Sequence, residues 1–492
     1  MSRLRGAAAL GLMLLWAGAA TAQEQRRCAV CGSFYDENPA RLRQQAAGFL
    51  LEAQKTQKPL SGLLALLAPH AGYYYSGQTA AYAYAAAGDS YDTVVIIGTG
   101  HNTRLEKAAL ADTAYSTPLG TVAPDMEAIA ALLENSSVFE LNNAAHATDH
   151  SVEVQLPLLQ ARLNKPFLLV PVLLNSSQLD GAVAAGKAIA KALKGKKALI
   201  VISSDLSHYP PANIARASDL ALLQSLQRLD PAYLELTANV LESKKAKNLS
   251  VAACGVEALE AGLAAAAELG ANQAQTLKYS NSADIPGIGS EKVVGYGAVA
   301  FTASPKPQPP ASPFSEQAQQ ALLSAARQAI QSGFGGAEFS PAPLSELPEL
   351  NLPFPMFVTL TQNGRLRGCI GTTKALASAL DSARYYARMA AFSDPRFSPL
   401  VPPELQSTRI EISALSEPAR VESPDAITPG RHGVILRNGE KQGLFLPQVW
   451  KELPAKEKFL EELCVQKAGL PGNCWRDKNT ELYVFEDYAF SD

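Results

Sequence analysis

The chain has 492 residues, more than one ordinary domain needs, so its length predicts two or three domains. Apolar residues make up 47% and charged residues 18%, a composition that can bury large cores and excludes a wholly disordered chain. A formal net charge of −3 argues against a nucleic-acid binder or a protein that binds anionic membranes. Six cysteines in so long a chain exclude a small fold scaffolded by disulfides.

Residues 1–22 have the pattern of a secretory signal peptide. Arg3 and Arg5 supply a positive start, an apolar run follows over residues 6–20, and Ala20-Thr21-Ala22 resembles a cleavage site. The apolar run is shorter than the ~20 residues of a comfortable membrane span, although an uncleaved anchor remains the alternative. We therefore expect an exported bacterial protein, periplasmic or secreted, with no stable membrane insertion after cleavage.

Four cysteines near the ends of the mature chain are candidates for disulfides, which export would permit. Cys28 and Cys31 form a C-x-x-C pair, but Gly32 stands where a c-type haem site needs a histidine. A local disulfide and two free thiols both fit this spacing. Cys464 and Cys474 could close a small loop, and sequence alone leaves all of these pairings open.

A proline-rich stretch divides the chain. Five of the ten residues from Ser304 to Pro313 are proline, which predicts an extended, semi-rigid linker. The expected parts are a signal peptide (1–22), a first domain (23–303), the linker (304–313) and a second domain (314–492). Five of the six histidines precede the linker and only His432 follows it, so the two domains differ in chemistry.

The first domain alternates short apolar runs with alanine-rich stretches. The predicted strands and helices, in chain order, are Leu63–Ala68, Thr93–Ile97, Phe167–Leu174, Gly181–Leu193 (helix), Ala198–Ser203 and Val256–Leu269 (helix). This alternation predicts a layered α/β domain with a central parallel or mixed sheet.

The second domain mixes both kinds of element and is expected to be a smaller, separate α+β fold. The predicted elements are the helix Gln317–Ser332, the strand Phe354–Thr361, the helix Ser378–Ala391, and the strands Arg409–Leu415 and His432–Leu436.

Histidines follow three of the strands predicted in the first domain. His70 comes after the first strand, His101 after the second, and Asp205 and His208 after the strand Ala198–Ser203. In open α/β sheets, ligands bind outside the carboxyl ends of the strands, so these side chains are expected to share one site. A lone histidine is more often structural, but three at the same topological position favour a site.

Two further segments are candidates to close this site. His146 and His150 flank a polar loop that precedes a helix, and Pro157 must lie in the first turn of that helix or bend it. Cys254 precedes Gly255, and a glycine there permits close backbone approach. The alternative interpretation of Cys254 is a small buried residue, which free cysteines commonly are.

Imidazoles combined with a thiolate or carboxylate suit a divalent transition metal such as iron, copper or zinc. Other chemistries fit poorly. Thr103 replaces the third glycine of a dinucleotide-binding fingerprint, and no P-loop, H-E-x-x-H or G-x-S-x-G motif occurs. Ser203, Ser204, Asp205 and His208 lie too close together in sequence to form a hydrolase relay without other residues.

Five motifs of the first domain resemble those of the Memo family and occur in the family's order. They are Pro69–Gly77 (PHAGYYYSG), Thr117–Gly120 (TPLG), Asp149–Pro157 (DHSVEVQLP), Ser203–His208 (SSDLSH) and Cys254–Gly255. The resemblance implies a layered αβα fold similar to that of class III extradiol dioxygenases, the LigB-like non-haem iron enzymes.

The same resemblance implies a metal site formed by His70, His101 and Cys254. Asp205 and His208 would line the pocket, with His150 nearby; His208 or His150 would act as acid or base, and Asp205 would orient a neighbour. Iron or copper is the expected metal, and zinc is an alternative. The sequence departs from the family at Gly100 and Asn102, where Ser and His are common.

The second domain resembles the AMMECR domain, a family with no settled biochemical activity. The matching motifs are Leu366–Gly371 (LRGCIG), Ala391–Phe397 (AFSDPRF), Glu411–Ser413 (EIS), Gly443–Gln448 (GLFLPQ) and Lys467–Gly469 (KAG). Cys369, with Arg367 nearby, is either a reactive thiol beside a cation or a packed residue in a β-turn. Asp394 and Arg396 are either a functional pair or a salt bridge that orders a loop.

A chain with both domains resembles proteins of the AmmeMemoRadiSam system, which occur with a radical-SAM protein. That partner needs the cytoplasm, so export argues against it here. Three functions fit the sequence: a metal-dependent oxidoreductase acting on dioxygen or a small organic substrate, a non-catalytic protein that binds copper or iron, and an interaction module whose pocket binds a peptide or small ligand.

Overall fold

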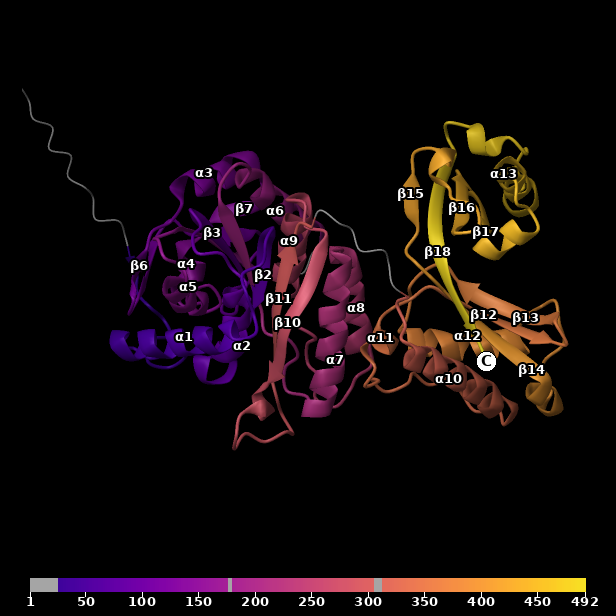
Figure 1. Cartoon of the computed structure of the whole chain (residues 1–492), viewed down its shortest axis with the longest axis horizontal. Helices are drawn as coiled ribbons and strands as arrows, with labels where there is room; N and C mark the ends of the chain where they lie inside the picture. The colour runs from indigo at the N-terminus through magenta and orange to yellow at the C-terminus, as the bar shows by residue number, and fades with distance from the viewer. Residues whose placement is uncertain (1–24, 176–178, 305–311) are drawn as a thin grey trace, which may run out of the picture.

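The computed structural model describes residues 25–175, 179–304 and 312–492, which form two domains side by side (Figure 1). The predicted signal peptide and most of the predicted linker lie outside the described residues. Among the helices that are described, none is long and apolar enough to cross a membrane.

The first domain is built on an eight-stranded mixed sheet. Its strands, in spatial order, are β10 (Gln273–Asn281), β11 (Gly295–Thr302), β2 (Leu63–Ala68), β9 (Ala198–Ser203), β3 (Thr93–Thr99), β8 (Leu168–Leu174), β4 (Ala108–Leu110) and β7 (Phe139–Leu141). The four central strands β2, β9, β3 and β8 run parallel. β10 and β11 pair antiparallel, as do β11 and β2, and β4 pairs antiparallel with β8 but parallel with β7. A small second sheet joins β1 (Gln25–Arg26), β5 (Ala114–Thr117) and β6 (Gly120–Val122).

Helices cover both faces of the eight-stranded sheet, because the central strands are apolar on both sides. In β2, for example, Ala65 and Leu67 pack into one core, whereas Leu66 and Ala68 pack into the other. One face is covered by α3 (Met126–Asn135), α6 (Leu179–Ala192), α7 (Ala212–Ser225), α8 (Pro231–Ser243) and α9 (Val256–Glu268). The opposite face is covered by α1 (Pro39–Gln54), α2 (Tyr73–Ala85) and α5 (Leu156–Arg162), with the short α4 (Asn143–Ala147) nearby.

The second domain is an α+β fold with a curled antiparallel sheet. Its strands, in spatial order, are β13 (Arg365–Thr372), β12 (Met356–Gln362), β14 (Thr408–Leu415), β18 (Glu481–Ser491), β16 (His432–Asn438) and β17 (Lys441–Phe445), with β15 (Ala419–Val421) also paired to β18. The long β18 connects the two halves of this sheet (Figure 1). The helices are α10 (Glu316–Phe334), α11 (Pro348–Asn351), α12 (Ala379–Phe392) and α13 (Lys456–Glu462).

The two domains share a buried interface, and their apolar cores are continuous. The Tyr233 hydroxyl donates a hydrogen bond to the Pro353 carbonyl across it at 3.0 Å. Lys244 forms an ion pair with Asp381, and both side chains are more than nine-tenths buried. Removing one partner of such a pair typically destabilises a protein by about 3–5 kcal/mol, so this interface fixes the domains firmly against each other.

The predicted elements agree with the structure to within two residues at each boundary, and both expected fold types are confirmed. Pro157 lies in the first turn of α5, as expected. Both candidate disulfides are formed, Cys28 with Cys31 and Cys464 with Cys474. The β-turn interpretation of Cys369 is wrong: this residue lies within β13, where alternation on the strand places its side chain beside Thr359.

Candidate metal centre

The three central strands bring the predicted site residues together. The strands β2, β9 and β3 are adjacent and parallel, so their carboxyl ends lie at one edge of the sheet. A cavity of about 410 Å³ opens at this edge. Among the residues that line it are the predicted site residues His70, His101, His150, Asp205 and His208.

Three of the predicted residues form a group that could hold a metal ion. The candidate ligand atoms of His70, His101 and Cys254 all lie within 4.8 Å of one another. The Nε2 atom of His101 is 3.1 Å from the Sγ atom of Cys254, and the ring of His70 meets the ring of His101 edge-on. Two imidazole nitrogens and a thiol are a donor set that suits iron, copper or zinc.

Hydrogen bonds fix which nitrogen of His70 faces the group. The hydroxyl of Ser203 donates to the Ser151 carbonyl at 2.6 Å, so it must accept at its other contacts. Those contacts are Nδ1 of His70 at 3.1 Å and the side-chain amide of Gln155 at 2.8 Å. The proton of His70 therefore lies on Nδ1, and the Nε2 lone pair points at the group. This Nε2 atom is buried and has no hydrogen-bond partner among the described residues.

His101 is oriented by a carboxylate that the sequence analysis did not assign. One oxygen of Asp149 accepts from the His101 backbone N–H at 2.9 Å and lies 3.0 Å from Nδ1. Burial alone would raise the pKa of Asp149, but hydrogen bonds from His101 and Ser151 hold it well below its ordinary value. An ionised Asp149 accepts the Nδ1 proton, so the Nε2 lone pair of His101 faces Cys254, as second-shell carboxylates commonly arrange.

Cys254 lies in the loop before α9, against the end of β3. A side chain at Gly255 would meet the Thr99 hydroxyl at 2.2 Å, which confirms that glycine is needed there for close approach. Burial, followed by the charges of Asp205 and Asp149, raises the pKa of the Cys254 thiol. The thiol is therefore protonated without a cation and donates to His101 Nε2. A metal ion would replace that proton, so the residues present fit a metal.

Asp205, His150 and His208 surround this group without joining it. Asp205 accepts from the backbone N–H groups of His70 and Ala71 at 2.8 and 3.2 Å, which fixes the loop that carries His70. His150 stacks on His101 with ring centroids 4.4 Å apart. Burial, followed by the charges of its histidine neighbours, lowers the pKa of His150 to about 4. Burial also lowers the pKa of His208, whose buried Nε2 atom has no hydrogen-bond partner in the part of the chain that the structure describes.

The structure separates His146 from the site. Its Nδ1 lies 2.7 Å from the Tyr115 hydroxyl and its Nε2 lies 2.9 Å from the Ala109 carbonyl, so both ring nitrogens are occupied in a buried position. His146 is thus a structural histidine, and the expectation that it helps to close the site is wrong. Asn102, where the sequence departs from the Memo pattern, lies 3.4 Å from Thr148 in the loop that precedes His150.

The N-terminal segment contributes a wall that the sequence analysis missed. Phe34 lines the cavity and contacts the ring of His150, with centroids 4.8 Å apart. Glu153 holds this segment in place by accepting from Arg26, from the backbone of residues 29 and 30, and from the Tyr35 hydroxyl. Pairing of this kind between distant segments has no local signal in the sequence.

The candidate residues of the second domain are engaged with one another. Arg367 forms a two-point ion pair with Glu404, 3.0 Å at each contact. Asp394 binds Arg396 and accepts from the backbone N–H of Cys369 at 2.8 Å. Arg396 donates to the Cys369 carbonyl at 3.1 Å, and its guanidinium also interacts with the Cys369 thiol. The Asp394–Arg396 pair and its bond to the Cys369 backbone fit the interpretation of a salt bridge that orders a loop.

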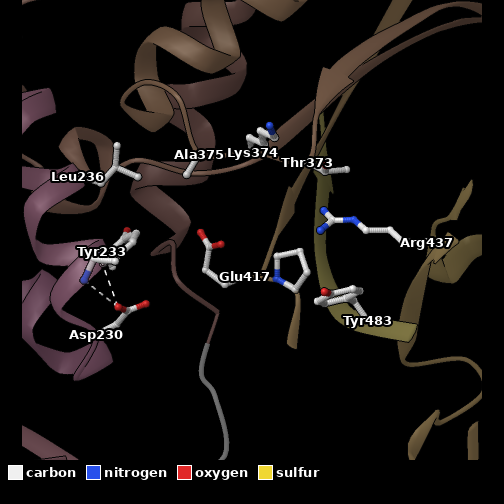
Figure 2. Close-up of a pocket in the computed structure, with 11 residues that line it drawn as sticks. Asp230, Tyr233, Leu236, Thr373, Lys374, Ala375, Glu417, Arg437 and Tyr483 are labelled. Carbon is white, nitrogen blue, oxygen red and sulfur yellow. Dashed lines mark hydrogen bonds between the residues drawn. The ribbon is translucent and has the colours of Figure 1, made fainter. Parts of the chain in front are cut away.

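A cavity of about 340 Å³ also lies between the domains, where α8 faces the loops of the second domain (Figure 2). Two of the charged groups that line it have partners: Glu417 lies 3.8 Å from Arg228, and Arg437 covers the Tyr483 ring at 4.8 Å. Asp230 caps α8 through the backbone N–H of Ala232. This cavity is a feature of the domain interface. The candidate metal groups found among the described residues, the one above and a second formed by His101, Asp149 and His150, both lie in the first domain.

Comparison with known proteins agrees with the division of the chain into two domains. Residues 26–300 match the model of the Memo-like protein family, and residues 323–490 match that of AMMECR1. A MEMO1 family protein of Nitrosopumilus maritimus is 36% identical over 242 residues, covering 49% of this chain and 85% of that protein. Another from Methanosarcina barkeri is 33% identical over 276 residues, covering 56% and 98%.

A crystal structure of an uncharacterized protein from Pyrococcus horikoshii shares 34% identity, covers 37% of this chain and 94% of that one, and aligns with a TM-score of 0.34. The Memo-like match extends over more than half of the chain and contains every residue of the candidate metal group. The chain therefore belongs to the Memo family and carries an AMMECR1 domain after its Memo-like domain.

Proposed function

We propose that the protein is a metal-dependent oxidoreductase that acts on a small organic molecule held in the cavity beside His70. The observation that carries this proposal is the buried Nε2 atom of His70, which lacks a hydrogen-bond partner within the described ranges and belongs to the group with His101 and Cys254. Unpaired polar atoms are rare in protein interiors, and a metal ion would satisfy this one. The resemblance to class III extradiol dioxygenases supports the same class of chemistry.

The cavity supports a substrate in addition to a metal. Three protein ligands leave coordination positions open, and a bound iron or copper ion would supply redox and Lewis-acid chemistry there. The aromatic rings of Phe34, Tyr75 and Tyr296 line the cavity and offer apolar surface to an organic molecule. A non-catalytic carrier has no need for such a chamber.

The remaining side chains of the cavity suit proton transfer. His150 and His208 are neutral near pH 7 because burial lowers the pKa of each, so either can accept a proton from a substrate. Asp205 acts as a positioning residue: its carboxylate holds the backbone of His70 and Ala71 and so keeps His70 in place.

A second candidate function is the binding of copper or iron without turnover. The thiol of Cys254 favours it, because extradiol iron sites use a carboxylate at that position and soft thiolates favour Cu(I). In either case we propose that the protein acts outside the cytoplasm, since its two disulfides suit an oxidising compartment. A radical-SAM partner is not part of this proposal.

Oxygen uptake tests the two functions against each other. The full chain would be loaded anaerobically with Fe(II) or Cu(I), mixed with a panel of small organic substrates that includes dihydroxyaromatic compounds, and exposed to dioxygen. Substrate-dependent oxygen uptake that is lost in Cys254→Ser and kept in Cys369→Ser supports the oxidoreductase. Tight Cu(I) binding with no uptake for any substrate supports the carrier and contradicts the oxidoreductase.

A further inference from the structure

The disulfide between Cys28 and Cys31 can be reached from outside, unlike the second disulfide of the chain. Cys28 and Cys31 are both half-buried, and Cys28 lines a surface cavity of about 500 Å³ together with its neighbour Arg27. Cys464 and Cys474 are only 0% and 6% exposed, within the core of the second domain. Thiol–disulfide exchange depends on access, so a reductant should reach the first disulfide much faster than the second.

The first disulfide closes a short turn that positions part of the wall of the metal-site cavity. Between the two cysteines, the Val30 carbonyl accepts from the backbone N–H groups of Ser33 and Phe34 at 3.2 and 2.8 Å. Ser33 and Phe34 both line the cavity beside His70. The place of this wall, Ser33 and Phe34, therefore depends on the backbone of a residue that the disulfide encloses.

The wall is also in contact with both loops that carry histidine ligands. The Phe34 carbonyl accepts from the Tyr73 backbone N–H at 2.7 Å, directly after the loop of His70. The Phe34 ring contacts His150, whose ring stacks on that of His101. A change in the turn would therefore reach the cavity through Phe34.

The turn is held from below by a carboxylate that does not depend on it alone. The backbone N–H groups of Ala29 and Val30 donate to the buried Glu153 carboxylate at 2.7 and 3.1 Å. Glu153 also accepts from Arg26 and from the Tyr35 hydroxyl, each at 2.6 Å. The turn can thus open without leaving a buried charge unpaired, which would otherwise be costly.

We propose that Cys28–Cys31 is a site of thiol–disulfide exchange with a dithiol, and that its reduction frees the wall of the metal-site cavity. One thiolate of the dithiol attacks Cys28, which lines the outer cavity, and Cys31, which packs against the core, leaves as a thiolate. The second thiolate of the dithiol then attacks its own sulfur in the mixed disulfide and releases Cys28 beside Arg27. Two electrons and two protons pass to the protein, and the dithiol becomes a disulfide.

The order in which the two disulfides are reduced is the first test. The full chain would be incubated with dithiothreitol, quenched with iodoacetamide and digested, and alkylation would be followed at each cysteine by mass spectrometry. Cys28 and Cys31 should be reduced at least about tenfold faster than Cys464 and Cys474. Equal rates, or faster reduction of Cys464 and Cys474, would overturn the proposal.

Hydrogen exchange then measures whether reduction frees the wall. Removing a cross-link from a loop of about four residues should favour local opening by about 10–30-fold. The amides of residues 29–35 and of Tyr73 should exchange faster by about that factor in the reduced full chain. The Ala318 amide, which donates to Ser315 in the second domain, should not change. Unchanged exchange at residues 29–35, or at Tyr73, would overturn the proposal.

Two variants give the same test without a reductant. Cys28→Ser combined with Cys31→Ser should reproduce the exchange of the reduced chain, with folding checked by circular dichroism. In this variant diethyl pyrocarbonate should modify His150 at least about threefold faster than in the natural chain, and His432 at the same rate. Phe34→Ala should make His150 react fast with or without the disulfide; an acceleration that persists in Phe34→Ala would overturn the role given to Phe34.

The movement of the wall can be tested apart from catalysis. Its consequence for turnover rests on the proposed function, because the wall matters only if a substrate enters the cavity. None of the three measurements needs a bound metal or a substrate. Failure of the proposed oxidoreductase would therefore leave their results unchanged, and their failure would leave the metal site untouched.

Discussion

Two clusters of chemically active side chains can be compared within this molecule, one in each domain. In the first domain, His70, His101 and Cys254 converge with their lone pairs and thiol directed at one another. In the second, Asp394 accepts hydrogen bonds both from Arg396 and from the backbone N–H of Cys369. Both clusters lie at motifs that stand out in the sequence. The difference lies in what the neighbouring residues leave unsatisfied: in the described part of the chain, the first cluster keeps a buried His70 Nε2 atom without a hydrogen-bond partner, as a metal site would require.

The largest effect is expected on metal affinity when one candidate ligand of the first cluster is replaced. Cys254→Ser should weaken metal binding by more than about a hundredfold, since even second-shell changes cost about 10–100-fold. Competition with a chelator of known affinity measures this. Cys369→Ser, which removes the other free thiol, is the matched control and should leave affinity unchanged. Equal losses in the two variants would contradict the assignment of Cys254.

The next effect tests the carboxylate that orients His101. Asp149→Asn should reduce metal affinity about 10–100-fold, because an amide no longer fixes the proton on Nδ1 of His101. The same competition assay applies. Asp125→Asn alters another buried aspartate, one that caps α3 and binds Thr93, and should affect stability but not metal affinity. Unchanged affinity in Asp149→Asn would show that Asp149 has no positioning role.

A smaller effect is the dependence of metal binding on pH. Burial raises the pKa of the Cys254 thiol, so metal binding near pH 7 must release its proton. Burial lowers the pKa of His70, so that imidazole is already neutral and releases none. Apparent affinity should therefore rise about tenfold for each unit of pH between 6 and 8. A flat profile, or the same slope in Cys254→Ser, would contradict proton release from this thiol.

The smallest expected effect is a loss of stability when the cluster of the second domain is changed. Asp394→Ala leaves the Cys369 N–H without its acceptor, which should lower the free energy of unfolding by about 1–3 kcal/mol. Chemical denaturation measures this, and metal content should stay unchanged. Arg420→Ala breaks an exposed ion pair with Glu481 and should cost less than about 1 kcal/mol. Loss of metal in Asp394→Ala would mean that the second cluster is coupled to the first.

The shared site of the first domain could be predicted from the sequence, because its residues follow the carboxyl ends of predicted strands. The apolar runs before His70, His101 and Asp205 are short and unbroken, and parallel strands carry their following loops to one edge. Chain order therefore predicted a shared site. His146 shows the limit of that logic: it lies four residues from His150, yet its ring turns to Tyr115 and the backbone of Ala109.

The partners that orient the ligands depend on contacts between distant segments. Ser203 and Asp149 both stand inside recognised motifs, so adjacency to a candidate ligand was the signal that could have found them. Gln155 also stands inside a recognised motif, but five residues from His150, so adjacency does not single it out. Phe34 has no such signal, because it contacts His150 from the N-terminal segment. The pairing of Arg367 with Glu404 likewise joins residues 37 positions apart.

Elemental analysis of the protein purified anaerobically tests the central claim most directly, with His70→Ala measured beside it. The account predicts close to one equivalent of iron or copper in the natural protein and loss of that metal in the variant. A folded natural protein that contains no transition metal, and takes up none when iron or copper is supplied, would contradict it.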